Sequence, residues 1–184
     1  MTQHEYVFVA ISIILGLSIT RLLGHAGGLI RAQRRARFHW ATALWAGSVM
    51  ILVLQMWWVG WELRDYADWS IVDFLFLVAG TIFVFGAAEL ALPVEDYDVG
   101  SDQELDYLNH SQTLGRISAA SMLAYFAVGP YYNIAMLENA ALPSIIVAGI
   151  GAALCLGIVV RPRWFRALSV LIGCYCVAVL YLTA

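Results

Sequence analysis

Lysine is absent from this sequence, and charged residues of any kind are scarce. Ten arginines stand against thirteen acidic residues, so the formal net charge is -3 and there is no basic excess for binding nucleic acid. Only 12% of the residues are charged, whereas 62% are hydrophobic and the mean hydropathy is +0.78. Because soluble domains contain roughly a quarter charged residues, a water-soluble globule is excluded. The composition indicates an integral membrane protein surrounded by membrane lipids.

Cysteine is rare and the common catalytic motifs are missing. Cys155, Cys174 and Cys176 lie inside apolar runs, where we interpret them as small core residues and not as a disulfide or metal site. The sequence contains no Walker loop, nucleophile elbow, H-E-x-x-H or C-x-x-C pattern. Only His25 among four histidines falls inside an apolar segment, so a bis-histidine haem would lack a second ligand. We expect no cofactor, no metal and no catalytic residues, and an enzyme is the least favoured function.

Apolar segments of membrane-spanning length make up most of the chain. A helix needs about 20 mainly apolar residues to cross a bilayer, and six segments meet or approach this length. The predicted fold class is all-α: a single polytopic transmembrane helix bundle over residues 1–184, with six spans and no sheet. The first segment lacks a positive n-region and a small-residue cleavage site, so we expect it to be retained as a helix. The spans lie at about 5–30, 40–63, 70–92, 112–136, 143–160 and 167–183.

The arginines predict the orientation of this bundle, because short arginine-rich loops stay in the cytoplasm. Alternation from the first loop places eight arginines on one side and only Arg64 on the other. We predict that both termini lie on the non-cytoplasmic side, with the bacterial inner membrane as the expected location. Tryptophans mark the outer interface (Trp57, Trp58, Trp61, Trp69) and the inner one (Trp40, Trp164). The eight arginines are Arg31, Arg34, Arg35, Arg37, Arg116, Arg161, Arg163 and Arg166.

The third loop is acidic and falls on the arginine-rich side. Its acids either face the arginines of the first and fifth loops, which would hold these loops together, or form a solvated loop; the sequence leaves both open. Ser101 and Glu104 have the spacing of a capping box, so the fourth helix is expected to begin near Asp102. The acids of this loop are Glu95, Asp96, Asp98, Asp102, Glu104 and Asp106.

Small residues recur at every fourth position of the first span. Such a ridge lets helix backbones approach closely, which drives helix packing in lipid. We predict that the ridge is buried against protein, either in the centre of the bundle or at an oligomer interface. The ridge consists of Ser12, Gly16, Thr20, Gly24 and Gly28.

Ionisable residues also occur within the predicted membrane. Ser18, Arg21 and His25 share a second face of the first span. An arginine at membrane depth costs about 2.5 to 3.5 kcal/mol, and Glu89 near the end of the third span is its expected partner, assisted by Arg116. The alternative is that Arg21 extends to the headgroups. A pair would be either a structural link or part of a polar pathway.

A thin polar stripe runs along the second span, where Ser48, Gln55 and Glu62 are spaced by seven. Together with Asp73 this stripe could line an outward-facing vestibule; alternatively, Gln55 makes one interhelical hydrogen bond. Gly129-Pro130 predicts a kink or an end in the fourth span, because proline has no N–H to donate. Broken helices form substrate sites in transporters, although many kinks are structural.

Two classes of function follow from these patterns. The first is an oligomeric channel or transporter whose polar path contains Arg21, His25, Glu89, Gln55 and Glu62. The second is an accessory or assembly subunit of a larger membrane complex, with no activity of its own, in which the small ridge is a packing surface. The expected partners are accordingly further copies of this chain or other membrane subunits.

Overall fold

The computed structural model describes residues 2–31, 36–94 and 105–183. Nearly all of the described chain is helical, because long apolar runs in a membrane must satisfy their backbone hydrogen bonds within the segment. The main helices are α1 (Gln3–Arg31), α2 (Trp40–Glu62), α3 (Ile71–Glu89), α4 (Tyr107–Gln112), α5 (Gly115–Tyr131), α6 (Ala141–Val160) and α7 (Phe165–Thr183). Short segments are η1 (Leu63–Asp65), η2 (Tyr132–Met136), η3 (Pro162–Trp164), β1 (Ala36–Arg37) and β2 (Leu105–Asp106).

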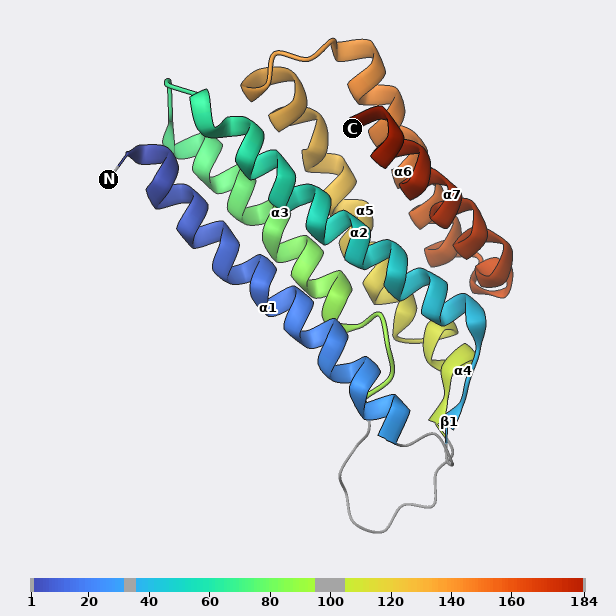
Figure 1. Cartoon of the computed structure of the whole chain (residues 1–184). Helices are drawn as coiled ribbons and strands as arrows, with labels where there is room; N and C mark the ends of the chain where they lie inside the picture. The colour runs from blue at the N-terminus through green and yellow to red at the C-terminus, as the bar shows by residue number, and fades with distance from the viewer. Residues whose placement is uncertain (1, 32–35, 95–104, 184) are drawn as a thin grey trace.

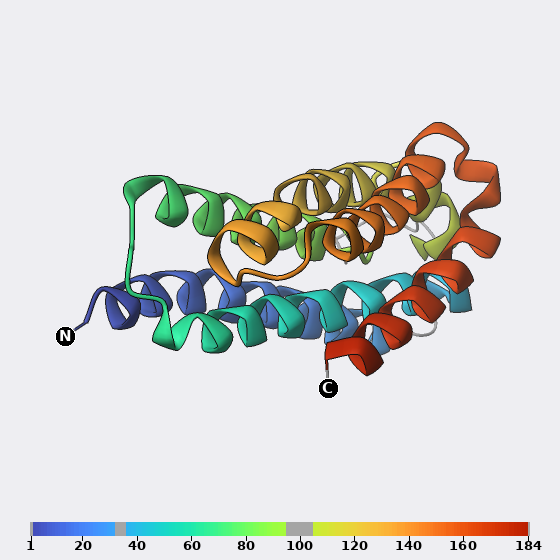
Figure 2. The ribbon, with the colours of Figure 1, turned by 90° about the horizontal axis from the view of Figure 1, so that it is seen from above.

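The long helices form two layers, in which α1, α3 and α6 run in one direction and α2, α5 and α7 in the opposite direction (Figures 1 and 2). One layer contains α1, α2 and α7, and the other contains α3, α5 and α6. We call one end of the bundle the acidic end: α1, α3 and α6 begin there and α2 and α7 end there. Its described acids are Glu5, Glu62, Asp65, Asp68, Asp73 and Glu138. The opposite, basic end carries Arg31, Arg37, Arg116, Arg161, Arg163 and Arg166, together with the acids Glu89 and Asp106.

Within the described residues, five helices are long and apolar enough to cross a membrane: α1, α2 with η1, α3, α6, and η3 with α7. The prediction of a multi-spanning helical protein is therefore confirmed at this level. The fourth predicted span, 112–136, is divided. α5 has 17 residues and passes at Tyr132 into a five-residue π-helical turn, closed by a 2.9 Å bond from Leu137 N to Tyr132 O. Pro130 lies just before this turn, where it cannot donate to the carbonyl of Phe126.

The basic end contains a short pairing that the sequence did not predict. β1 and β2 pair in parallel over two residues each. The expectation of no sheet is therefore wrong only for this short pairing. Nearby, Thr42 Oγ1 lies 2.7 Å from Ser111 Oγ and donates to Tyr107 O at 3.1 Å, which ties α2 to α4. Strands pair here because the connections after α1 and before α4 meet at the same end of the bundle.

The helix that follows β2 begins at Tyr107, where Asp106 accepts hydrogen bonds from the backbone N–H groups of Leu108 at 2.9 Å and Asn109 at 3.1 Å. This Asp106 cap satisfies donors that a helix start leaves open. The expected start near Asp102 and the Ser101–Glu104 capping box lie outside the described residues. The same is true of Arg34, Arg35 and the five remaining acids of the third loop, Glu95, Asp96, Asp98, Asp102 and Glu104.

The middle of the small ridge of α1, from Gly16 to Gly24, is not covered by the chain, whereas Gly28 and the Ser12 hydroxyl oxygen are buried. α1 therefore does not occupy the bundle centre, which was one of its two expected places. A Cβ built on Gly16 or Gly24 would meet no atom within 4 Å, and Thr20 is exposed. α1 instead packs through its larger residues, among them Ile11, Leu15 and Leu22, because α2 and α3 cover that face and the ridge points away from them. The part of the ridge around Gly16 and Gly24 is left as a surface of the single chain.

Candidate ligand site at the acidic end

A cavity of about 590 Å³ lies between α2, α5 with η2, α6 and α7. It reaches from Glu62 at the acidic end down to Leu52, a depth of about 15 Å at 1.5 Å per helical residue. Exposed residues form its rim, including Glu62, Asn139 and Thr183, and buried residues form its floor, including Leu52, Tyr125 and Tyr132. The cavity therefore enters the bundle from one end and stops near its middle.

Two residues of the predicted polar stripe line this cavity. Gln55 and Glu62 lie in its wall, and Glu62 Oε1 accepts a 3.0 Å hydrogen bond from Trp58 Nε1. Within the described residues the Gln55 side chain has no hydrogen-bond partner on another helix, so its amide faces the cavity unpaired. Ser48, the third member of the stripe, is buried outside the cavity and donates to Leu44 O at 2.9 Å.

The break in α5 forms the opposite wall. Gly129, Tyr132 and Asn133 all line the cavity, so the π-helical turn is part of its surface. Asn133 Nδ2 donates to Gly129 O at 3.1 Å, and Asn139 N donates to Asn133 O at 2.9 Å. Between them Glu138 adopts a left-handed backbone with φ of 55°, which is uncommon for a residue with a side chain. The wall is thus an irregular segment held by its own hydrogen bonds.

Asp73 does not line this vestibule, contrary to its expected place. It is buried on the other side of the break, where Oδ1 accepts a 2.7 Å hydrogen bond from the Tyr131 hydroxyl. Its Oδ2 accepts from Ser70 N at 2.8 Å and Ser70 Oγ at 2.6 Å in a capping box at the start of α3. Asp73 therefore fastens the end of α5 to α3 and holds the broken segment from behind.

Four aromatic residues of the cavity were missed from the sequence. Tyr125, Phe126, Tyr132 and Tyr175 all line it. The ring of Phe126 packs against Tyr125 at 5.4 Å and against Tyr175 at 5.7 Å between centroids, and the Tyr175 hydroxyl donates to Val147 O at 3.1 Å. The signal available in the sequence was the spacing of Tyr125, Gly129 and Tyr132, which puts a gap between two rings on one helix face.

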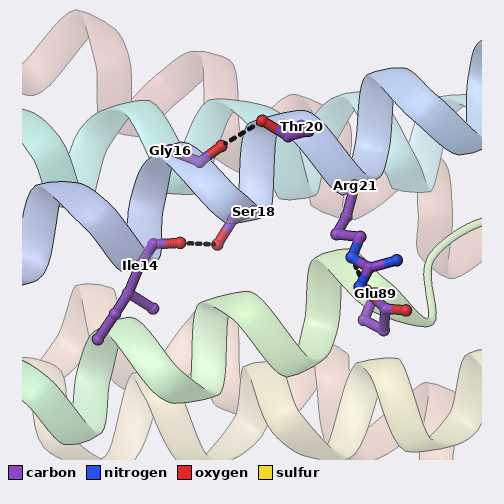
Figure 3. Close-up of polar contacts among 6 residues, drawn as sticks. All are labelled: Ile14, Gly16, Ser18, Thr20, Arg21 and Glu89. Carbon is purple, nitrogen blue, oxygen red and sulfur yellow. Dashed lines mark hydrogen bonds and ion pairs between the residues drawn. The ribbon is translucent and has the colours of Figure 1, made fainter.

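The second group of predicted residues lies elsewhere, between α1 and α3 near the basic end. Arg21 Nε is 3.2 Å from Glu89 Oε2, so the expected ion pair is present (Figure 3). The two side chains are 55% and 33% exposed, so the pair is not sealed in the core. Ser18 donates to its own helix at Ile14 O, 2.9 Å away. His25 Nδ1 is buried without a hydrogen-bond partner among the described residues.

Arg116 does not assist this pair, which corrects that part of the prediction. Its Nε donates to Val159 O on α6 at 3.0 Å, because the start of α5 faces the end of α6 at the basic end. None of Arg21, His25, Glu89 or Arg116 lines the cavity that contains Gln55 and Glu62. The predicted polar residues thus form two separate groups and no single cluster.

The acidic end carries an excess of negative charge around the cavity mouth. Among the described residues its only arginine is Arg64, whose Nε lies 3.3 Å from Asp65 Oδ2. Burial, together with Asp73 and Asp68, raises the pKa of the Tyr66 phenol in the loop before α3. The potential at this end is therefore negative and attracts cations.

No protein-family model, curated protein or solved structure matches the chain. The functional argument accordingly starts from the cavity and its lining.

Proposed function

We propose that this chain is a small multi-pass transport protein that binds a solute in the cavity at the acidic end. The observation that supports it is the position of the α5 break, which lies in the wall of a cavity of about 590 Å³. Ligand cavities commonly have volumes of about 300 to 1,000 Å³. Transporters place substrates at discontinuous helices, and π-helical turns are frequent at functional sites. An irregular wall can also change shape more easily than a continuous helix.

The proposal includes six spans with the cavity open to the outside. α5 and η2 together cover Gly115–Met136, about 33 Å at 1.5 Å per residue, which matches a hydrocarbon core of about 30 Å. The arginines at the basic end favour a cytoplasmic location for that end. Both termini then lie outside, and in a bacterium the cavity faces the periplasm.

This orientation is tested by cysteine labelling with a membrane-impermeant reagent. Single cysteines at Arg163 and Asp68 are introduced into a variant that lacks the three native cysteines. Asp68→Cys should react in intact cells and Arg163→Cys only after lysis. Equal reactivity of both positions in intact cells would contradict the proposed orientation.

Transport is tested by blocking the cavity in reconstituted vesicles. Ser144 lines the cavity, so Ser144→Trp should fill it and abolish uptake of the solutes that wild-type protein admits. Gly149 lies on the same helix with no atom within 4 Å of an added Cβ, so Gly149→Trp is the matched control and should transport normally. Uptake that is unaffected by Ser144→Trp, or absent in wild-type protein for every solute in a broad panel, would overturn the proposal.

A second candidate, an assembly subunit, is favoured by the exposed ridge of α1. Gly16 and Gly24 leave open space on the surface, and small ridges of this kind accept a partner helix in membranes. The partner would be a second copy of this chain or another membrane subunit. Mass measurement of the intact complex in mild detergent distinguishes a single species from one with foreign subunits.

A further inference from the structure

We propose that the solute bound in the cavity is an organic cation, a quaternary or protonated amine. This inference rests on the proposed transport function and specifies its substrate class. It is carried by the charge, the aromatic rings and the helix ends that surround the cavity.

Among the residues that the structure describes, the cavity lining carries a negative charge and no positive one. Glu62 is the one formally charged side chain among the described residues that line it. Trp58 donates a single hydrogen bond to Glu62 Oε1, so the carboxylate keeps lone pairs for a ligand. The further acids at this end add attraction at longer range, because a low-dielectric cleft focuses a field of one sign.

The orientation of the helices adds to this potential. α2, α5 with η2, and α7 present their C-terminal ends to the acidic end, and only α6 presents its N-terminus among the helices that line the cavity. Each helix end carries roughly half an elementary charge, negative at the C-terminus and positive at the N-terminus. Three negative ends therefore outweigh the one positive end, and Pro143 removes one N–H from the first turn of α6.

The lining is suited to an organic cation rather than to a bare metal ion. Trp58, Tyr125, Phe126, Tyr132 and Tyr175 contribute five aromatic rings, whose faces attract ammonium groups. The Tyr175 hydroxyl already donates to Val147 O, so this residue offers its ring rather than a hydrogen-bond donor. Calcium requires about six to eight oxygen ligands around a small site, which one carboxylate in a cavity of about 590 Å³ does not provide.

The test compares choline with two molecules of nearly the same shape. In dimethylbutanol carbon replaces the ammonium nitrogen and removes the charge, and dimethylbutanoate carries a negative charge. Binding to the full-length protein in detergent is followed by calorimetry and by quenching of tryptophan fluorescence. We expect choline to bind at least about tenfold more tightly than dimethylbutanol, because cation–π attraction in a partly desolvated site and the Glu62 charge act only on the cation.

Variants assign this preference to the cavity. Glu62→Gln and Tyr175→Leu should each weaken choline binding by about 3- to 30-fold and leave dimethylbutanol unchanged. Asp65→Asn is the control, since Asp65 lies at the same end outside the cavity and pairs with Arg64; because this charge is exposed and acts only at long range, its removal should weaken choline binding much less than Glu62→Gln does.

The outcomes separate this inference from the proposed function. Equal binding of choline and dimethylbutanol, or tighter binding of dimethylbutanoate, overturns the cation inference and leaves transport standing. If choline does not bind, but another solute is taken up and Ser144→Trp abolishes this uptake, the cation inference is likewise overturned and the transport proposal stands. No binding and no uptake that depends on the cavity overturn both.

Discussion

The hydroxyl of Tyr131 donates a 2.7 Å hydrogen bond to Oδ1 of Asp73, which joins the last residue of α5 to the first turn of α3. The phenol ring also stacks on Phe76 with 4.0 Å between centroids. This contact fixes the segment just before the π-helical turn. The cavity wall therefore depends on a carboxylate that does not itself face the cavity.

Tyr131→Phe should lower the free energy of unfolding by about 1.5 to 3 kcal/mol, because it removes a hydrogen bond to a charged acceptor and keeps the stacked ring. Tyr6→Phe is the control, since Tyr6 is 61% exposed at the same end and should change little. Both are measured by reversible unfolding in mixed micelles. Equal stability of the two variants would show that the Asp73 contact does not hold the α5 break.

The ion pair of Arg21 and Glu89 should contribute modestly. Its side chains are 55% and 33% exposed, so removal of one partner does not strand a fully buried charge. A double-mutant cycle with Arg21→Ala and Glu89→Ala should give a coupling of about 1 kcal/mol, below the roughly 3 to 5 kcal/mol lost when a sealed pair is broken. A coupling of zero would mean that Arg21 interacts with headgroups instead.

Glycine substitutions should distinguish the exposed ridge from true close contacts. Gly16→Ala meets open space, whereas a Cβ on Gly151 would lie 2.6 Å from the ring of Phe126. Gly151→Ala should therefore destabilise the monomer by about 1 to 3 kcal/mol through overpacking, and Gly16→Ala should not. Gly16→Leu should alter only oligomeric mass, measured in mild detergent. A monomer melting point that falls equally in Gly16→Ala and Gly151→Ala would contradict this account.

Acidification should destabilise the basic end through two histidines. Burial, with a smaller contribution from Arg166, lowers the pKa of His39, whose Nδ1 accepts from Ala41 N at 3.2 Å as the cap of α2. Burial, with a smaller contribution from His25, also lowers the pKa of His110, whose Nε2 lies 3.1 Å from Leu90 O. Because the pKa values of both histidines in the folded protein lie below 6.5, the ordinary value for histidine, the unfolded chain binds more protons than the folded chain as the pH falls. The contribution of the two neutral histidines to the free energy of unfolding is therefore fully present above about pH 6.5 and is lost as the pH falls below it.

This pH dependence is measured as the melting temperature between about pH 7.5 and about pH 5, the range in which histidine titrates. His39→Asn retains a capping acceptor but does not titrate. The variant should show a shallower decline than wild-type protein. An identical slope in both proteins would exclude His39 as a source of the effect.

The sequence alone predicted the features that depend on position along a span. Arg21 and Glu89 were matched because each lies close to the basic end of its own helix, and helix rise fixes depth within a membrane. Glu62 and Gln55 were placed on one face of α2 for the same reason. Segment length and hydropathy were sufficient to identify five long apolar helices.

Features that depend on which helix faces which were not predictable. A small ridge favours close packing but does not identify the partner, and Gly16 and Gly24 point away from the chain. Arg116 was grouped with Glu89 by depth, yet it lies on the side of α5 that faces α6. The aromatic floor around Phe126 forms only when α5, α6 and α7 meet.

The two-residue pairing of β1 with β2 and the Thr42 contacts join the start of α2 to α4 at the basic end, so we predict that α2 tilts about this end. α2 has 23 residues, about 35 Å at 1.5 Å per residue, so a tilt about its first turn moves its last residue, Glu62, the furthest. A tilt of about 5° about the basic end displaces the other end of α2 by about 3 Å, roughly the width of a water molecule. We predict that spin labels at Trp61 and Leu142, which are exposed and lie outside the cavity lining, change their separation when solute binds. Labels at the exposed residues Trp40 and Leu114 of the basic end should keep theirs. The mouth of the cavity then widens or narrows as α2 tilts, while the contacts that join α2 to α4 at the basic end stay the same.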